Sequence, residues 1–347
     1  MKIENLEGSG SVTFTFNATT ALVTGASSGI GYALAAGLAA RGMNLIITAR
    51  RKDRLEALAE QLGEQVTVVP IAADLSSQSG VDDLLTAVQN LSVTVDVLVN
   101  CAGLAPHGKF LETTDLDQQA LAQLNVLTPT RLIRHFLPNM QSRGFGRILN
   151  VCSIAGFHAV PGMAQYGATK AYLLSLTEAL SEEIKGSGVA ISALCPGVTR
   201  TDSVIQAAVE ALPDALVLDP DVVAEAGLEA LAKGEVVCIP GRLNQAAVTA
   251  AQFQPRWLIR SFGGLLAKFG SSGSNKRIQW VDSTWVKKKE RAMDIRPNPE
   301  QIDPAWMTNV LQARCPGCEG TGLSGDSIGT GQVGENVRFT LTGHEAP

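Results

Sequence analysis

Two residues of the stretch AQYGATKAY, residues 164–172, place a phenol and an ammonium at helical spacing. Tyr166 and Lys170 are four apart, so on a helix their side chains share one face, about 5 to 6 Å apart at their first carbons. A phenol beside an ammonium can give and take a proton. Packing is the alternative, because a Tyr-x-x-x-Lys pair arises by chance in roughly one in ten such chains.

The elements around this pair follow an alternating pattern from residue 20 onward, with short apolar runs between longer helical-period segments. Strands are expected at 21–24, 44–48, 66–71, 95–100, 146–151, 189–194 and 235–240. Helices are expected at 51–62, 79–91, 116–137, 164 to about 185, and 219–234. We therefore predict an α/β fold with a doubly wound, parallel, seven-stranded sheet of the Rossmann type. Its ligands should lie at the carboxyl ends of the strands.

A glycine-rich segment, TGASSGIG at 24–31, directly follows the first expected strand. Gly25, Gly29 and Gly31 have no Cβ atom. The turn can therefore be tight, and backbone N–H groups can approach a pyrophosphate where a helix begins near Ile30. An ordinary glycine turn capped by Ser27 or Ser28 is the alternative. The position between a strand and a helix in the first βαβ unit favours cofactor binding.

The end of the second strand, TARRKD at 48–53, lies where a Rossmann fold distinguishes NAD from NADP. Arg50 is nineteen positions after Gly31, and a guanidinium offers a planar fork for a 2′-phosphate. We therefore predict NADP(H). The alternatives are that Arg50 and Arg51 are solvated residues of the first helical turn, or that Asp53 approaches the ribose.

Together with NCAG at 100–103, Asn125, Ser153 and CPGVTRT at 195–201, these motifs resemble those of the short-chain dehydrogenase/reductase family in type, order and spacing. The resemblance covers about residues 18–245. Within the family, ARRKDRLEAL, CPGVTRTD and IPGRLN resemble the branch of bacterial DltE-type reductases and their ketone- or acyl-reducing relatives.

The resemblance implies a catalytic tetrad. Tyr166 would be the proton donor and acceptor, and Ser153 would donate a hydrogen bond that positions the substrate carbonyl. Lys170 would bind the nicotinamide ribose and favour the deprotonated tyrosine, while Asn125 would hold a water chain to Lys170. Singly, these residues could be a cap, a packed aromatic and a surface amide. Their joint position at the carboxyl edge of the sheet favours chemistry.

The resemblance also implies contacts to the adenine after the third strand, to the nucleotide after the fourth, and to the nicotinamide carboxamide after the sixth. The expected cofactor residues are Gly25, Ser27, Ser28, Gly29, Ile30, Gly31, Arg50, Asp74, Leu75, Asn100, Ala102, Gly103, Tyr166, Lys170, Pro196, Gly197, Thr199 and Thr201. Cys101 departs from the asparagine that is more usual in the family, which should weaken a strand-end hydrogen bond.

The composition is that of a globular protein, with 347 residues, 45% hydrophobic and 18% charged, and a net charge of −5. This charge gives no general basis for nucleic-acid binding. MKIENLEGSG lacks the basic start and apolar run of a secretory signal, and no apolar segment approaches the ~20 residues that span a bilayer. We expect a cytoplasmic protein with reduced cysteines.

The chain changes character after residue 240. We expect an N-terminal segment at 1–17, the catalytic domain at 18–245, a basic amphipathic helical extension at 246–291 and a mostly disordered tail at 292–347. Residues 256–269 combine apolar and basic side chains, which suits a membrane surface, a partner groove or a helix that covers the sheet. CPGCEGTG at 315–322 supplies only two cysteine ligands, so we predict no metal site.

We therefore expect an NADPH-dependent oxidoreductase that transfers hydride between a nicotinamide and a carbonyl or secondary alcohol. The apolar segment 203–219, where the family has its substrate lid, indicates a largely apolar small molecule such as a steroid-like ketone, a fatty-acyl derivative or a xenobiotic carbonyl. The family also implies a homo-oligomer, paired through the Asn125 and Tyr166 helices. A non-catalytic NADP(H) sensor or scaffold and a peripheral-membrane reductase of lipid carbonyls are the alternatives.

Overall fold

The computed structural model describes residues 20–201, 217–252, 254, 318–331 and 334–345, the last two ranges as backbone only. The chain divides into two compact units, Met1–Lys276 and Arg277–Pro347. The expected N-terminal segment at 1–17, most of the lid at 203–219 and the basic stretch at 256–291 lie outside the described residues.

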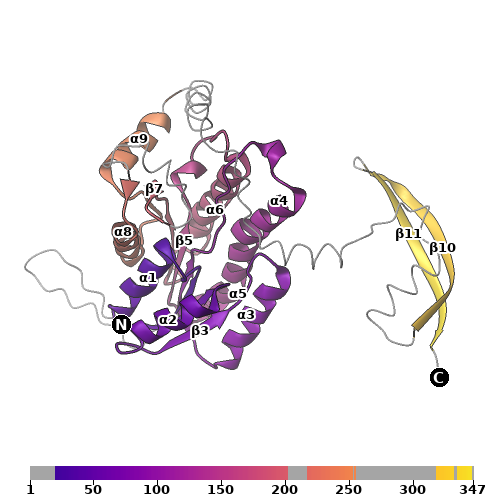
Figure 1. Cartoon of the computed structure of the whole chain (residues 1–347), viewed down its shortest axis with the longest axis horizontal. Coiled ribbons are helices and arrows are strands. Elements are labelled where there is room, and N and C mark those ends of the chain that lie inside the picture. The colour runs from indigo at the N-terminus through magenta and orange to yellow at the C-terminus, as the bar shows by residue number, and fades with distance from the viewer. Residues whose placement is uncertain (1–19, 202–216, 253, 255–317, 332–333, 346–347) are drawn as a thin grey trace, which may run out of the picture. The chain divides into compact units, whose positions relative to one another are not determined.

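A seven-stranded sheet with parallel pairing throughout and the order β3-β2-β1-β4-β5-β6-β9 forms the centre of the first unit (Figure 1). This confirms the predicted doubly wound sheet. The strands are β1 Thr20–Thr24, β2 Asn44–Ala49, β3 Val68–Ala72, β4 Val95–Asn100, β5 Gly146–Val151, β6 Val189–Leu194 and β9 Val237–Cys238. A separate parallel pair joins β7 Val198–Thr199 to β8 Val217–Leu218.

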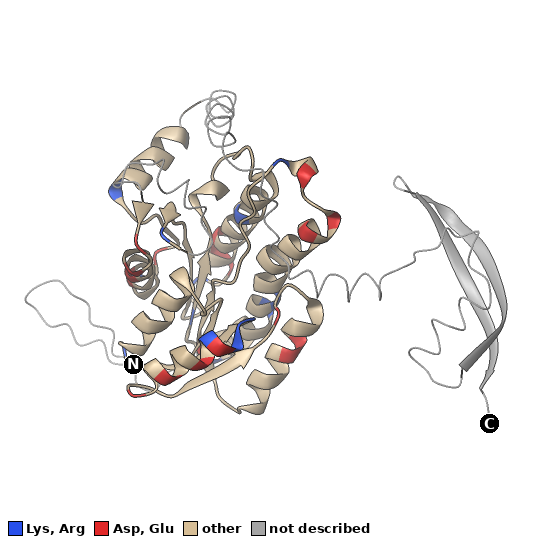
Figure 2. Ribbon diagram, in the orientation of Figure 1, with Lys and Arg blue, Asp and Glu red and all other residues tan. Residues whose placement is uncertain are grey.

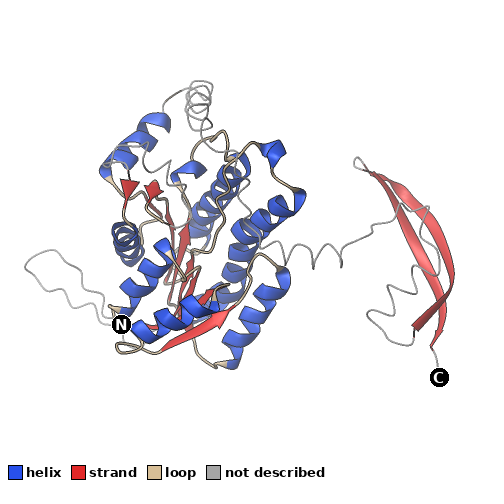
Figure 3. Ribbon diagram, in the orientation of Figure 1, coloured by secondary structure: helices blue, strands red, loops and turns tan. Residues whose placement is uncertain are grey.

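Helices cover both faces of this sheet (Figure 3). The α-helices among the described residues of the first unit are α1 Gly29–Ala39, α2 Lys52–Leu62, α3 Gln78–Asn90, α4 Asp115–Ala122, α5 Thr128–Arg143, α6 Ala164–Glu183, α8 Pro220–Lys233 and α9 Arg242–Gln252. Short 3-10 turns occur at η1 Phe110–Glu112 and η3 Ile154–Gly156, and a π-helical turn at η2 Gln123–Leu127.

Alternate residues of each strand point to opposite layers, as strand geometry requires. Ala21 and Val23 of β1 pack in a cluster with α1, α2 and α8. Leu22, between them, packs in a second cluster with α3, α5 and α6. The two buried layers hold the strands in register, so the carboxyl ends of β1, β4, β5 and β6 come to one edge of the sheet.

The helix expected at 116–137 is broken in the structure. α4 ends at Ala122, η2 follows, and α5 begins at Thr128 with Pro129 in its first turn. Pro129 has no N–H and therefore cannot donate to the carbonyl of Asn125, four residues earlier, so a regular α-helical ladder cannot continue through this point. π turns are rare and often lie at functional sites, and this one contains Asn125.

The carboxyl-terminal part of the described chain adds two features to the expected organisation. α9 crosses the boundary expected between residues 245 and 246. Within the tail expected to be mostly disordered, β10 Cys318–Gly331 and β11 Gly334–Glu345 form an antiparallel pair. Val337, Phe339 and Leu341 alternate with polar residues, a pattern that favours a strand. Among the described residues, no helix is long and apolar enough to cross a bilayer.

Candidate active site

The glycine loop between β1 and α1 has no room for side chains. A Cβ on Gly25, which has φ of 72°, would lie 2.8 Å from the backbone of Ala102. A Cβ on Gly31 would lie 2.2 Å from the carbonyl oxygen of Gly25, and one on Gly29 would lie 2.9 Å from a methyl of Thr201. These close approaches require glycine at all three positions. The loop therefore fits a group that needs direct contact with backbone N–H groups.

The amino end of α1 is available to an anion. Ser28 is the N-cap residue, but its side chain makes no capping hydrogen bond. The first N–H groups of α1, at Gly29, Ile30 and Gly31, have no partner within the helix. Unpaired donors and the positive end of the helix dipole suit a phosphate.

Arg51, rather than Arg50, faces this loop. Its Nη2 donates to Ser27 Oγ at 3.0 Å and to Ser28 Oγ at 2.9 Å. Arg50 is exposed, and its side chain makes no hydrogen bond within the described part of the chain. Arg51 is the N-cap residue of α2 and has an extended backbone, which directs its guanidinium back over the glycine loop. Basic residues gather at this β2–α2 junction (Figure 2).

The residues expected to contact the adenine lie on the loop that follows β3. Asp74 Oδ1 accepts hydrogen bonds from the backbone N–H of Ser76 at 3.1 Å and from Ser76 Oγ at 2.6 Å. The carbonyl oxygen of Leu75 accepts from Thr128 Oγ1 at 2.8 Å. Both residues are therefore held in fixed positions at the carboxyl edge.

Thr24 joins the ends of β1 and β4, a role that the sequence did not indicate. Its Oγ1 donates to the carbonyl oxygen of Val99 at 3.1 Å and accepts from the N–H groups of Cys101 at 3.0 Å and Ala102 at 3.1 Å. The sequence signal for this role is a threonine at the end of an apolar strand, directly before Gly25. These hydrogen bonds fix the NCAG segment beside the glycine loop.

Cys101 is held in place by its backbone. Burial raises the pKa of its thiol to about 12, although the positive charge of Lys170 lowers it in part. The thiol is therefore neutral near pH 7. The expected loss of a strand-end hydrogen bond is offset by Thr24, which binds the Cys101 N–H.

Lys170 is buried, with 5% of its surface exposed, and its Nζ donates to the carbonyl oxygen of Val151 at 2.7 Å. An ammonium carries three donors, so Lys170 can also bind acceptors such as the hydroxyls of a ribose. Its Nζ is 5.8 Å from the centre of the Tyr166 ring. The structure thus brings the phenol and the ammonium together, and within the described residues the Tyr166 hydroxyl has no hydrogen-bond partner.

Ser153 is fixed at the start of η3. Its Oγ accepts from the N–H of Ala155 at 3.1 Å, which leaves its own O–H free to donate. The turn packs closely on α6, since a Cβ on Gly156 would lie 3.0 Å from the Lys170 carbonyl and one on Gly167 would lie 3.2 Å from the Ala155 oxygen. The small residues beside Tyr166 thus permit this contact.

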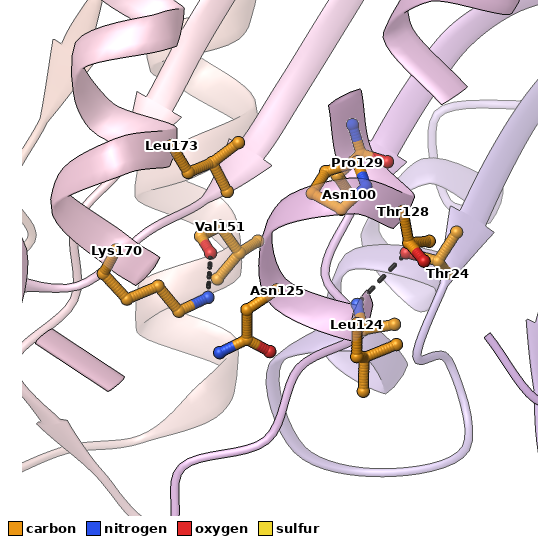
Figure 4. Close-up of a pocket in the computed structure, with 10 residues that line it drawn as sticks. Thr24, Asn100, Leu124, Asn125, Thr128, Pro129, Val151, Lys170 and Leu173 are labelled. Atoms are coloured by element: carbon orange, nitrogen blue, oxygen red, sulfur yellow. Dashed lines mark hydrogen bonds between the residues drawn. The ribbon is translucent and has the colours of Figure 1, made fainter. Parts of the chain in front are cut away.

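Asn125 is almost fully buried and uses its whole amide. Its Oδ1 accepts from the N–H of Leu104 at 2.9 Å, and its Nδ2 donates to the Leu104 carbonyl at 2.9 Å and to Thr169 Oγ1 at 3.1 Å. A cavity of about 10 Å³ lies between Asn125, Lys170, Thr24 and Asn100 (Figure 4). This is room for roughly one water. Asn100 Oδ1 is buried without a partner at this place.

The segment expected to hold the carboxamide follows β6. The N–H of Ile154, next to Ser153, donates to the carbonyl oxygen of Pro196 at 3.0 Å. Thr199 Oγ1 donates to the carbonyl oxygen of Gly197 at 3.2 Å, and Thr201 contacts Gly29. The structure therefore brings the expected segments to one edge of the sheet, where Arg50 directly follows β2 and is exposed. No group of three or more possible metal ligands occurs among the described residues.

A model of the short chain dehydrogenase family matches residues 19–210 of the chain. The chain belongs to the short-chain dehydrogenase family. An uncharacterized oxidoreductase of Bacillus subtilis, YvrD, is 35% identical over 183 residues, which are 53% of this chain and 69% of that protein. The family is one of oxidoreductases. The narrower assignment to the DltE-type branch stays a prediction.

Solved structures of this family resemble the short-chain dehydrogenase described here. One from Sphingobium yanoikuyae, in complex with NADPH, has 32% identity and a TM-score of 0.62, covering 77% of this chain and 99% of that chain. A bulky-bulky ketone specific alcohol dehydrogenase from Comamonas testosteroni has 32% identity and a TM-score of 0.60, covering 76% and 100%. A Burkholderia phymatum enzyme in complex with NAD has 27% identity and a TM-score of 0.61, covering 68% and 93%.

Proposed function

We propose that this short-chain dehydrogenase is an NADPH-dependent reductase of ketones or related carbonyls, and that it runs in reverse as an alcohol dehydrogenase. The observation that carries the proposal is the buried Lys170 ammonium beside Tyr166. A buried charge costs much free energy unless other groups pair with it and hydrogen-bond to it. Here it lies beside a phenol that has no other partner, at the edge of the sheet where this fold binds its ligands.

The residues of the chain fit a dinucleotide along this edge. The glycine loop and the amino end of α1 would hold the pyrophosphate, and the Asp74 loop would hold the adenine. Lys170 would bind the ribose next to the nicotinamide, and the segment after Pro196 would bind the carboxamide. The bound nicotinamide supplies or accepts the hydride.

The chemistry of the protein is then proton transfer and charge stabilisation. As hydride reaches the carbonyl carbon, negative charge builds on the carbonyl oxygen. The Ser153 O–H donates a hydrogen bond to that oxygen, and the Tyr166 O–H transfers its proton to it, which gives the alcohol. The phenolate left on Tyr166 is stabilised by the positive charge of the buried Lys170 ammonium.

Arg51 supports NADPH as the preferred cofactor. Its guanidinium donates hydrogen bonds to Ser27 and Ser28 of the glycine loop, and arginine pairs well with phosphate. Solved relatives bind either NADPH or NAD, so this residue, rather than family membership, is the basis of the proposal. The carbonyl class rests on the resemblance to the bulky-bulky ketone specific alcohol dehydrogenase and on the apolar segment 203–219.

The test is a panel of bulky ketones, aldehydes and β-ketoacyl thioesters, followed by NADPH absorbance. Turnover of at least one ketone or ketoacyl class, with higher kcat/KM for NADPH than for NADH, supports the proposal. Tight NADPH binding without turnover across the panel would instead support the non-catalytic sensor.

We also propose a homo-oligomer paired through α5 and α6. Thr130 Oγ1 and the Tyr172 hydroxyl are 3.1 Å apart and hold these helices together. Leu127 and Tyr172 are 55% and 41% exposed at this place, and a second copy of the chain would cover their apolar surface. Light scattering of the wild type and of Leu127→Asp tests the pairing. A wild type of monomeric mass would contradict it.

A further inference from the structure

Asn244 is a buried polar residue on α9, outside the residues 19–210 that match the family model. It is 6% exposed, and Val248, one turn later, is 4% exposed. The two residues share the inner face of the helix. Asn244 Nδ2 donates to the carbonyl oxygen of Pro240 at 3.2 Å, which fixes the side chain to the turn between β9 and α9.

The amide of Asn244 lies directly against the segment expected to hold the nicotinamide. A Cβ on Gly197 would lie 2.7 Å from Asn244 Nδ2 and 2.9 Å from its Cγ and Oδ1, and these are its three nearest neighbours. Gly197 does not have a positive φ, so its backbone would accept alanine. The side chain of Asn244 occupies the space that the methyl group of an alanine at position 197 would need.

The contact has a counterpart at the other end of the same segment. Thr201 lies against Gly29 of the phosphate loop, where a Cβ would be 2.9 Å from its methyl. The segment from Pro196 to Thr201 is thus held between the phosphate loop on one side and α9 on the other. A displacement at Gly197 changes where the segment lies relative to Ser153, because Ile154 donates to the carbonyl of Pro196.

We propose that Asn244 is a positioning residue that sets the place of the Pro196–Thr201 segment, and through it the nicotinamide end of the cofactor. The inference rests on the proposed function, since it assigns that segment to the nicotinamide. It adds that α9, the first helix after the sheet, is part of the cofactor site. Asn244 acts through Gly197 and makes no contact with the reacting atoms.

The matched experiment uses Gly197→Ala, Asn244→Ala and the double variant Gly197→Ala/Asn244→Ala in the full chain. Two ligands are titrated by calorimetry: NADPH, and 2′-phospho-ADP-ribose, which lacks the nicotinamide. In Gly197→Ala the new methyl overlaps Asn244, so NADPH should bind about tenfold more weakly or worse. The affinity for 2′-phospho-ADP-ribose should stay within about twofold, because the phosphate loop is unchanged. Asn244→Ala in the same background removes the overlap and should raise the NADPH affinity again, to about that of Asn244→Ala alone.

Equal weakening for both ligands would overturn the inference, because the effect would then be on the fold in general. Failure of the double variant to recover would overturn it too. If Gly197→Ala does not fold, Asn244→Ala alone decides: it should lower NADPH affinity several-fold with 2′-phospho-ADP-ribose unchanged, and unchanged affinity for both ligands would contradict the inference. A wild type that binds neither ligand would instead contradict the proposed function.

Discussion

The Nδ2 atom of Asn125 lies 3.1 Å from Thr169 Oγ1, the residue directly before Lys170. The same amide binds both backbone groups of Leu104, just after the NCAG segment. The π turn, the loop after β4 and helix α6 are therefore joined by one side chain. This arrangement holds the backbone next to Lys170, while Lys170 Nζ itself donates to the carbonyl oxygen of Val151.

Replacing Asn125 by leucine should be destabilising, because it keeps similar volume but leaves the partly buried N–H and C=O of Leu104 without their partners. Two lost pairings of this kind cost about 2 to 4 kcal/mol of unfolding free energy. Urea denaturation of the cofactor-free protein measures it. Asn139→Leu is the control, since Asn139 is exposed and binds Arg143 at the surface. Equal stability of the two variants would contradict the assigned role.

Gly31→Ala should unfold the glycine loop or shift it, because the new methyl would lie 2.2 Å from the carbonyl oxygen of Gly25. We expect a loss of about 3 kcal/mol or more and no measurable dinucleotide binding. Gly42→Ala is matched to it: Gly42 has φ of 78° and nothing within 4 Å of a Cβ. That variant should cost only about 1 to 2 kcal/mol and should bind dinucleotide normally. Dinucleotide binding by Gly31→Ala at wild-type affinity would contradict the role of the glycine loop in binding the pyrophosphate.

The two arginines after β2 should differ in effect. Arg51→Ala removes a guanidinium held at the glycine loop, so NADPH affinity should fall about tenfold to a hundredfold, while NADH affinity changes little. Arg50→Ala should have a small effect on both. Fluorescence titration with each cofactor measures the ratio. A larger loss of NADPH affinity in Arg50→Ala than in Arg51→Ala would restore the assignment that the sequence favours.

Spacing along the chain was sufficient to predict the sheet and most of the site. All seven strands, the glycine loop and the Tyr166–Lys170 pair lie where local patterns place them, because strand alternation and the carboxyl-edge rule act over short distances. The expected strand at 95–100 has the same bounds in the structure, Val95–Asn100.

What the sequence did not predict depends on direction and on contacts between distant segments. The hydrogen bonds of Arg51 to Ser27 and Ser28 depend on the extended backbone of the α2 N-cap, which the local pattern of residues 48–53 does not indicate. The contact of Asn244 with Gly197 joins residues 47 positions apart. The break at Asn125 could have been predicted from Pro129, since a proline removes the hydrogen bond four residues earlier.

The most direct test of the proposed chemistry is Tyr166→Phe, with Tyr172→Phe as the control. Tyr172 is on the same helix but takes no part in the proposed chemistry, because it is exposed and its hydroxyl binds Thr130. Tyr166→Phe removes one hydroxyl and keeps the ring beside Lys170, so NADPH should bind within about twofold of the wild type. Carbonyl-dependent NADPH oxidation should fall by about a thousandfold, while Tyr172→Phe should keep it. Turnover by Tyr166→Phe at the wild-type rate would contradict Tyr166 as the acid and base of the reaction.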